Sequence, residues 1–293
     1  MRDPRLQRDF LAAIDENSRA RDRRSVFADF CRLAALSLET AIAIGTFDTR
    51  RRDENDREYL AILDRYGRDE IERAEATQTF VRALYIVIEA LEAERRDFLG
   101  HCYEALNATV KHFGQYLTPD NVARLMGRFT MEKPDPAHIP LVLNDPACGA
   151  GALLIEAAEV YIDERGGRQG DLRIFAEDLD PVAADIAYIQ LYLLGYPARV
   201  TRMDTLAQKG DRPRYTAGVF AHGAMDIFKR NSTTTQQQQQ QKQKGQAHNE
   251  QTRQGDPPGT GEARRVPARR SAGHRGNGGG GAFAPVGHSR APG

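Results

Sequence analysis

The residues with the clearest chemical potential form a turn of small side chains, Asp145-Pro146-Ala147-Cys148-Gly149-Ala150-Gly151. The turn follows the apolar run LVLN and leads directly into the helix-like run ALLIEAAEVYI. Glycines at a strand-to-helix turn let a ligand approach the backbone, and the start of the helix offers unpaired N–H groups. This pattern predicts a site for a nucleotide-containing ligand. The alternative is a tight turn with an inert acid.

Two common kinds of nucleotide site do not fit this turn. A dinucleotide site requires GxGxxG or GxGxxA, and here Gly149 and Gly151 are followed by Leu154 at the third position. A phosphate-binding loop requires GxxxxGK[ST], which the chain lacks. The sequence therefore disfavours a ligand that is held by its phosphates.

Acidic residues recur where the predicted strands end, at Asp145, Asp178 and Asp204. The carboxyl ends of parallel strands share one crevice, and a carboxylate there can accept hydrogen bonds from both hydroxyls of a ribose. Glu177 is the alternative ribose acid if the register differs by one residue. Asp180, ahead of Pro181, fits a helix N-cap. For Asp204 the alternative is a structural role as the cap of a turn.

The turn and its surroundings resemble the S-adenosylmethionine-dependent DNA adenine-N6 methyltransferases, and in particular the modification subunits of type I restriction systems. DPACGAG is similar to the DPACGSG motif of that family, with Ala150 in place of Ser or Thr. The upstream stretch FGQYLTPDNVARLM (residues 113–126) looks like the family's GQFFTP element. AEDLDP (residues 176–181) and Met203-Asp204-Thr205-Leu206 resemble its second and third motifs, with Ala176 and Met203 in place of glycines.

The resemblance implies S-adenosyl-L-methionine as the cofactor and assigns a role to each part of the motifs. The GQYLTP element would close over the methionine part, Asp178 would bind the ribose, and Asp204 would accept from the adenine amine. The cofactor-binding residues implied in this way are Gln115, Tyr116, Thr118, Pro119, Asp145, Ala147, Gly149, Gly151, Asp178 and Asp204. No metal site is expected.

The family's catalytic signature, (Asn/Asp/Ser)-Pro-Pro-(Tyr/Phe), has no counterpart in the chain. The only Pro-Pro pair stands in Asp256-Pro257-Pro258-Gly259, with glycine in place of the aromatic residue and no apolar strand before it. A base flipped out of DNA must regain its stacking and hydrogen bonds in the pocket, so this pair is rejected. We therefore expect only the cofactor-binding half of the sheet, and the catalytic residues remain unassigned.

The function implied by the resemblance is methyl transfer to adenine N6 in DNA if the chain is catalytically complete. The alternatives are a non-catalytic S-adenosylmethionine-binding accessory subunit, a truncated methylase of a restriction-modification or mobile-element system, and a methyltransferase for a small molecule or protein. The expected partners are DNA and either restriction or specificity subunits or a chain that completes the sheet. No membrane is expected among them.

The elements that position these residues fall into three regions. Residues 1–110 show apolar positions every three or four residues, which predicts a helical bundle; the charged stretch DTRRRDENDRE is a solvated loop or a helix start. In residues 111–230 short β-like runs (IPLVLN, LRIFAED, ARVTRMD) alternate with helical ones. This alternation predicts an α/β fold with a parallel sheet in the order 3-2-1. We further expect either PRYTAGVFAHG (residues 213–223) or a partner to cover the free edge of the first strand.

The third region, residues 231–293, is rich in Gln, Gly and Arg and is expected to be disordered because it offers little apolar surface to bury. It is either a linker or the product of a frameshift. It carries nine basic and three acidic residues, a net of about +6, which leaves about −6 for the rest because the whole chain has 41 of each. The three cysteines stand far apart and no run approaches ~20 apolar residues. We therefore expect a soluble cytoplasmic protein without disulfides.

Overall fold

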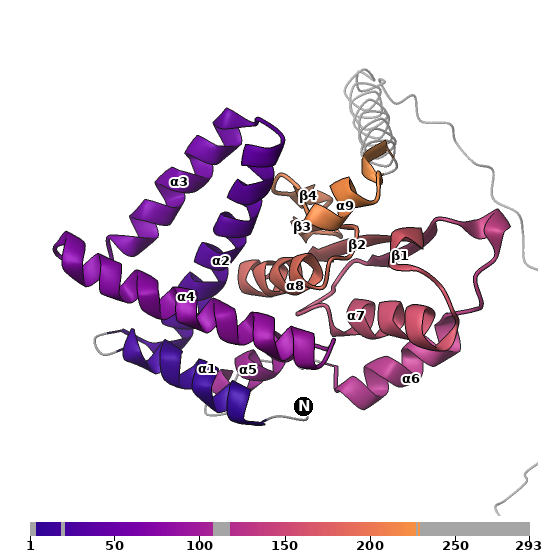
Figure 1. Cartoon of the computed structure of the whole chain (residues 1–293), viewed down its shortest axis with the longest axis horizontal. Helices are drawn as coiled ribbons and strands as arrows, with labels where there is room; N and C mark the ends of the chain where they lie inside the picture. The colour runs from indigo at the N-terminus through magenta and orange to yellow at the C-terminus, as the bar shows by residue number, and fades with distance from the viewer. Residues whose placement is uncertain (1–3, 19–20, 108–117, 227, 229–293) are drawn as a thin grey trace, which may run out of the picture. The chain divides into compact units, whose positions relative to one another are not determined.

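The computed structural model describes residues 4–18, 21–107, 118–226 and 228, and Figure 1 shows their arrangement. All of these residues belong to one compact unit, Met1–Gln237. The predicted boundaries near residues 110 and 230 stay predictions. The predicted tail, residues 231–293, lies outside the described residues.

The first described part is helical, as predicted. The helices α2, α3 and α4 each start at an acid that accepts a backbone N–H, such as Asp22 from Ser25 or Asp69 from Ile71 and Glu72. The charged stretch at residues 48–58 forms a helix start, because Asp48 accepts from the Arg51 N–H and caps α3. The helices are α1 (Pro4–Glu16), α2 (Arg23–Gly45), α3 (Thr49–Leu63), α4 (Glu70–Ala93) and α5 (Phe98–Asn107).

The second part alternates strands and helices, and the three predicted strands are present. The strands are β1 (Leu141–Asp145), β2 (Leu172–Asp178), β3 (Ala198–Asp204), β4 (Lys209–Gly210) and β5 (Arg214–Tyr215). The α-helices are α6 (Asp120–Thr130), α7 (Ala152–Glu159), α8 (Pro181–Leu193) and α9 (Ala217–Ala221). Short 3-10 turns occur at Pro136–His138 and Gln169–Asp171, and a π-helical turn, Val160–Glu164, continues α7.

The sheet has the predicted parallel order, with β2 between β1 and β3. The prediction that residues 213–223 would cover the edge of β1 is wrong. In that segment β5 pairs antiparallel with β3, so that Arg199 lies opposite Tyr215 and Val200 opposite Arg214. The preceding strand, β4, pairs antiparallel with the carboxyl end of β3. Among the described strands, β1 pairs only with β2.

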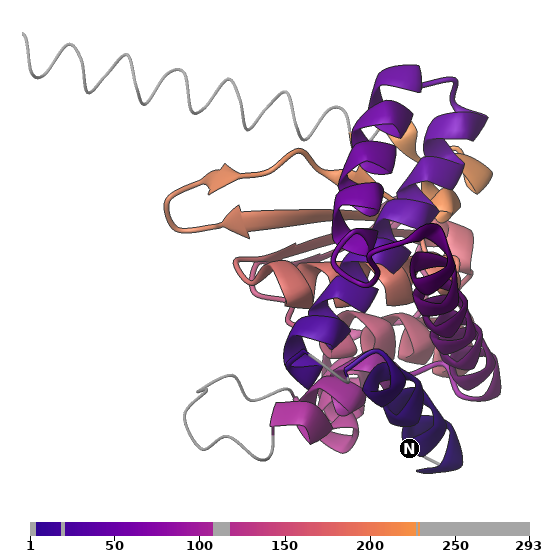
Figure 2. The same ribbon diagram turned by 90° about the vertical axis from the view of Figure 1, so that its left-hand side faces the viewer.

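The two faces of the sheet are covered differently because side chains alternate along each strand. Leu143, Ile174 and Val200 belong to a large core that includes α7, α8 and the helical region, so one core joins both parts of the chain. On the opposite face Phe175 packs with Val219 and Phe228 in a small separate cluster. Figure 2 shows the β3–β4 hairpin extending beyond the other strands at the carboxyl side of the sheet.

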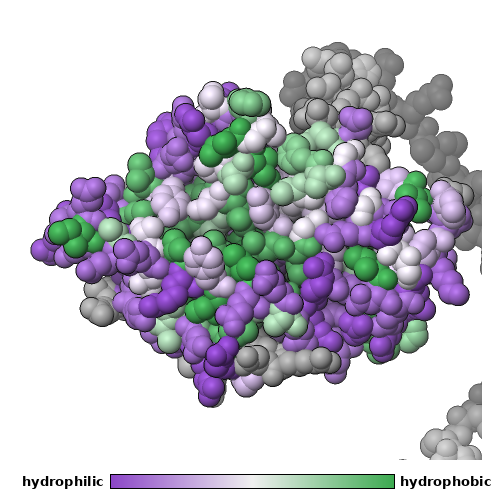
Figure 3. Space-filling model, in the orientation of Figure 1, coloured by the Kyte–Doolittle hydropathy of each residue, from purple (hydrophilic) through white to green (hydrophobic). Residues whose placement is uncertain are grey.

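The surface carries hydrophilic side chains around its rim in the view of Figure 3, and hydrophobic ones gather towards the centre, where α4 passes near α8. None of the helices in the described residues is long and apolar enough to span a membrane. The three cysteines, Cys31, Cys102 and Cys148, are buried and free, as expected from their spacing.

Candidate functional site

The predicted ligand turn lies between β1 and α7, and its backbone favours glycine at two positions. Gly149 has φ 55° and Gly151 has φ 90°, in the left-handed region that side chains disfavour. Gly151 is also the N-cap of α7, where no side chain caps the helix. Asp145 stabilises the start of the turn, since its Oδ1 accepts the Ala147 N–H at 3.0 Å. The turn thus presents backbone at the end of β1.

The turn after β2 is locked to this first turn by hydrogen bonds. The Cys148 N–H donates to the Glu177 carbonyl at 2.9 Å, and the Gly149 N–H donates to Asp178 Oδ2 at 2.8 Å. The other oxygen of Asp178 accepts the Asp180 N–H at 2.9 Å. Asp180 caps α8 through the Val182 N–H, as predicted. The structure therefore brings Gly149 and Asp178 together.

The alternative ribose acid, Glu177, points to the opposite face of the sheet. Its carboxylate pairs with Arg199 at 3.3 Å and accepts from the Thr205 hydroxyl at 3.3 Å. Arg199 also lies over the ring of Phe175, 5.0 Å from its centroid. Because neighbouring strand residues point to opposite faces, Asp178 and not Glu177 shares a face with the ligand turn.

Two acids, Asp145 and Asp178, lie near each other at the turn. Burial raises the pKa of Asp145, and the nearby charge of Asp178 raises it further, against the lowering effect of the Ala147 N–H. A cationic group between these carboxylates would relieve their repulsion. Burial likewise raises the pKa of the Cys148 thiol well above its ordinary value, which favours the neutral thiol, and the side chain belongs to the core.

The third acid, Asp204, lies in a more exposed turn. Its Oδ1 accepts the Ala207 N–H at 2.8 Å, which is the turn-capping role given above as the alternative. Thr205 connects this turn to the first one, because its hydroxyl donates to the Pro146 carbonyl at 2.9 Å. The next residue, Leu206, is 99% exposed. The three strand ends thus meet, but the third is held by fewer described contacts.

The GQYLTP element is only partly within the described residues. Gln115 and Tyr116 lie outside them. Pro119 is the N-cap of α6, so the helix starts at Asp120 and not at Pro119. Asp120 binds His101 of α5 at 2.8 Å, which raises the pKa of the histidine. A cavity of about 620 Å³ next to this helix start is lined by Arg96, His101, Glu104, Pro119, Asp120, Asn121, Arg124, Leu125 and Arg128.

One polar residue that touches the ligand turn, Gln190 of α8, was not predicted from the sequence. Its side-chain N–H donates to the carbonyl of Ala150 at 3.0 Å, and it is fully buried. The available signal was a single amide in the apolar helical run IAYIQLYLL. A buried amide requires hydrogen-bond partners, and here they include the backbone of the turn.

Comparisons with known proteins place these features in context. The model of the family described as N-6 DNA Methylase matches residues 94–255, more than half of the 293-residue chain. No match was found among curated proteins.

Among solved structures, the chain is similar to the methyltransferase subunit of a type I restriction-modification system from Streptococcus thermophilus. The sequence identity is 16% and the TM-score is 0.32. The match covers 66% of this chain and 56% of that chain, so this chain spans little more than half the length of that subunit.

Proposed function

We propose a function for this chain on the premise that it belongs to the N-6 DNA methylase family, whose model matches more than half of its length. The proposed function is binding of S-adenosylmethionine at the ends of β1, β2 and β3, with transfer of its methyl group to adenine N6 of DNA. The observation that carries the proposal is the hydrogen bond from Gly149 to Asp178, which joins the glycine turn to the acid of the next strand.

The residues fit a ligand that has a cationic and a nucleoside end. Asp145, at the end of β1 with Asp178 nearby, lies where its carboxylate could attract an ammonium group. Gly149 and Gly151 allow the left-handed backbone of the turn, and Gly151 lies against Ala187 of α8. Asp178 has lone pairs left for ribose hydroxyls, because each carboxylate oxygen accepts one backbone N–H and can accept another hydrogen bond.

In its family role the bound cofactor supplies a methyl group on a positively charged sulfur. The described residues of this chain would bind and orient it, and no covalent intermediate with the buried, neutral Cys148 is expected. Thr118 and Pro119, with Gln115 and Tyr116, are proposed to contact its methionine end. Asp204 is proposed to accept from the adenine amine.

Isothermal titration calorimetry of the full chain with S-adenosylhomocysteine, the demethylated cofactor product, tests the binding step. Saturable binding with one site per chain is expected, and it should weaken in Asp178→Ala. Absence of binding heat and of any thermal shift at millimolar ligand would overturn the site. Tritiated methyl transfer to unmethylated DNA then tests the reaction.

A second candidate is a non-catalytic S-adenosylmethionine-binding subunit that works with other chains. It is favoured by the absence of an (Asn/Asp/Ser)-Pro-Pro-(Tyr/Phe) sequence from the 293 residues. DNA, restriction or specificity subunits and a chain that completes the sheet at β1 are its proposed partners. Cofactor binding without methyl transfer by the isolated chain would distinguish this candidate from the enzyme.

A further inference from the structure

A buried side chain outside the recognised motifs connects the ligand turn to the helical region. Gln190 of α8 has no exposed surface. Its Nε2 donates to the Ala150 carbonyl at 3.0 Å and to Asp97 Oδ1 at 2.9 Å. Its Oε1 accepts the N–H groups of Phe98 and Leu99, at 2.8 and 3.0 Å. The amide therefore uses both of its polar atoms, and each of them has two partners.

Two of these partners are N–H groups at the start of α5. The first N–H groups of a helix have no partner within it. Gln190 satisfies two of them, and Asp97, itself only 3% exposed, accepts a third from Gly100 at 2.7 Å. The start of α5 is therefore held by an amide from α8, and the same amide holds the glycine turn.

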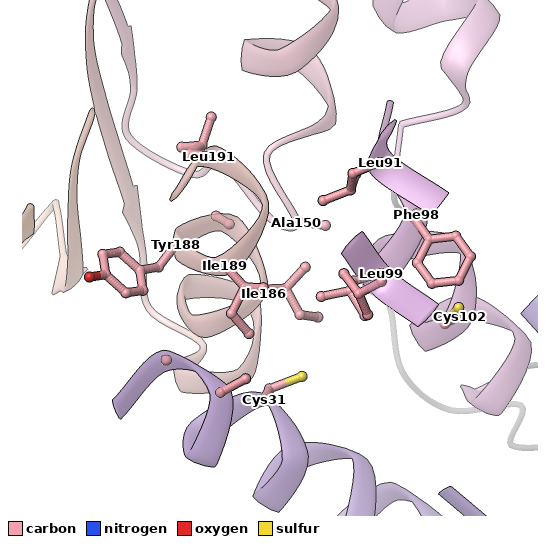
Figure 4. Packing of buried hydrophobic residues seen from close by; sticks show 14 of the residues in the cluster. Cys31, Leu91, Phe98, Leu99, Cys102, Ala150, Ile186, Tyr188, Ile189 and Leu191 are labelled. Carbon is pink, nitrogen blue, oxygen red and sulfur yellow. The ribbon is translucent and has the colours of Figure 1, made fainter. Parts of the chain in front are cut away.

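Apolar packing supports the same connection. Ala150 is 1% exposed and belongs to the core that includes Leu91 and Ile186. Figure 4 shows Ala150 among side chains of α4, α5 and α8, with Leu99 nearby. A residue of the ligand turn thus lies against the helical region, so movement of α5 or α8 must move the turn or open a gap.

The helix α5 also contacts the start of α6. His101, one turn further along α5, binds Asp120, the residue that follows Thr118-Pro119. Through Gln190 and His101, α5 contacts both the glycine turn and the helix that follows the GQYLTP element. The glycine turn and the start of α6 therefore share one support.

We infer that Gln190 is a positioning residue for the cofactor, which fixes the Ala150 carbonyl and so the glycine turn relative to α5. This inference rests on the proposed function, because it concerns the same ligand turn. Gln190 itself contacts no part of the proposed ligand. Its role is to hold Gly149 and Gly151 in the conformation that accepts it.

The test combines cofactor affinity with amide hydrogen exchange of the ligand-free full chain. In Gln190→Met the side chain keeps its size and loses all four hydrogen bonds. We expect at least tenfold weaker binding of S-adenosylhomocysteine and at least tenfold faster exchange in a peptide covering residues 146–156. Gln190→Asn keeps an amide on a shorter side chain, and it provides a milder variant with effects in the same direction.

Two variants separate positioning from simple loss of stability. Asn55→Leu removes another buried amide, which binds Thr40 within the helical region, and it should lower Tm without changing affinity or exchange in residues 146–156. Asp97→Asn keeps an oxygen that can accept from Gly100 and Gln190, so its effects on affinity and on exchange in residues 146–156 should be smaller than those of Gln190→Met.

The possible results test the positioning role of Gln190 separately from the proposed cofactor binding. If the wild-type chain binds no S-adenosylhomocysteine, the proposed function fails, while the exchange measurement still tests whether Gln190 holds the turn. If wild type binds and the Gln190 variants match Asn55→Leu in both affinity and local exchange, the positioning role is wrong.

Discussion

The ends of β1 and β2 differ sharply from the end of β3, although all three carry an acid of the proposed site. The first two ends are joined by two hydrogen bonds, from Cys148 to the Glu177 carbonyl and from Gly149 to Asp178. The third end continues into a hairpin, where Asp204 caps an exposed turn. One hydroxyl, that of Thr205, connects the third end to the first.

This difference suggests that the site has a rigid part and an adaptable part. Interlocked backbone and buried partners keep the glycine turn in one conformation before a ligand arrives, which lowers the ordering cost of binding. The exposed third turn has fewer such contacts. We therefore expect substitutions in the first two ends to affect cofactor binding more strongly than substitutions in the third.

The largest effect is expected for Gly151→Val. A β-branched residue at φ 90° is strained, at a cost of roughly 1–3 kcal/mol in stability, and the shifted turn should abolish measurable cofactor binding. Gly166→Val is the matched control, because Gly166 has φ 79° and lies in open space away from the site. Thermal unfolding and calorimetry should show similar destabilisation and retained binding in the control. Equal loss of binding in both variants would contradict a local role for Gly151.

Asp178→Ala should follow, with cofactor affinity reduced by about 1–3 kcal/mol because the ribose loses its acceptor and two N–H groups lose theirs. Calorimetry with S-adenosylhomocysteine measures this loss. Glu177→Ala is the comparison one residue away, and it should leave the affinity near that of wild type because its side chain lies on the other face. The reverse ranking of these two variants would move the ribose site to Glu177.

Asp145→Asn should have a smaller effect that depends on pH. The pKa of Asp145 is raised in the folded chain, so the stability it contributes is complete at low pH and is lost as pH rises through the folded pKa. The variant should therefore gain stability relative to wild type as the pH rises above about 4, near the ordinary pKa of aspartate, while it binds the cationic ligand about tenfold more weakly. Unfolding curves at several pH values and calorimetry at pH 7 check both signs.

The smallest effect is expected for Asp204→Ala, about 0.5–1.5 kcal/mol of cofactor affinity. Its carboxylate is partly exposed and already accepts the Ala207 N–H, so water can replace much of its contribution. A loss larger than that of Asp178→Ala in the same titration would show that the third strand end is as rigid as the first two.

Local patterns were sufficient to predict the main strands and the helical region. LRIFAED and ARVTRMD correspond residue for residue to β2 and β3, because each is a short β-like run that stands between helical runs. Asp180 was correctly predicted as a cap, since an N-cap acid ahead of proline acts on its own neighbours. The positions of the acids at the strand ends could also be predicted, because they depend only on where each strand ends in the local sequence.

Long-range partners could not be predicted in this way. The segment at residues 213–223 contains only two strand residues, Arg214 and Tyr215, and nothing in their sequence distinguishes the edge of β3 from that of β1. The choice between Glu177 and Asp178 depended on the register of the strand. Gln190 finds its partners about 40 and 90 residues away in the chain.

The sequence by itself determined the elements and the chemistry at their ends: a helical region, three parallel strands, a glycine turn and its acids. These features depend on periodicity, caps and backbone conformation, which involve residues close together in the chain. The tertiary structure alone decided which sheet edge the chain covers and that Gln190 joins the turn to α5. Those outcomes depend on contacts between distant residues, which fold and strand register bring together and which no local pattern specifies.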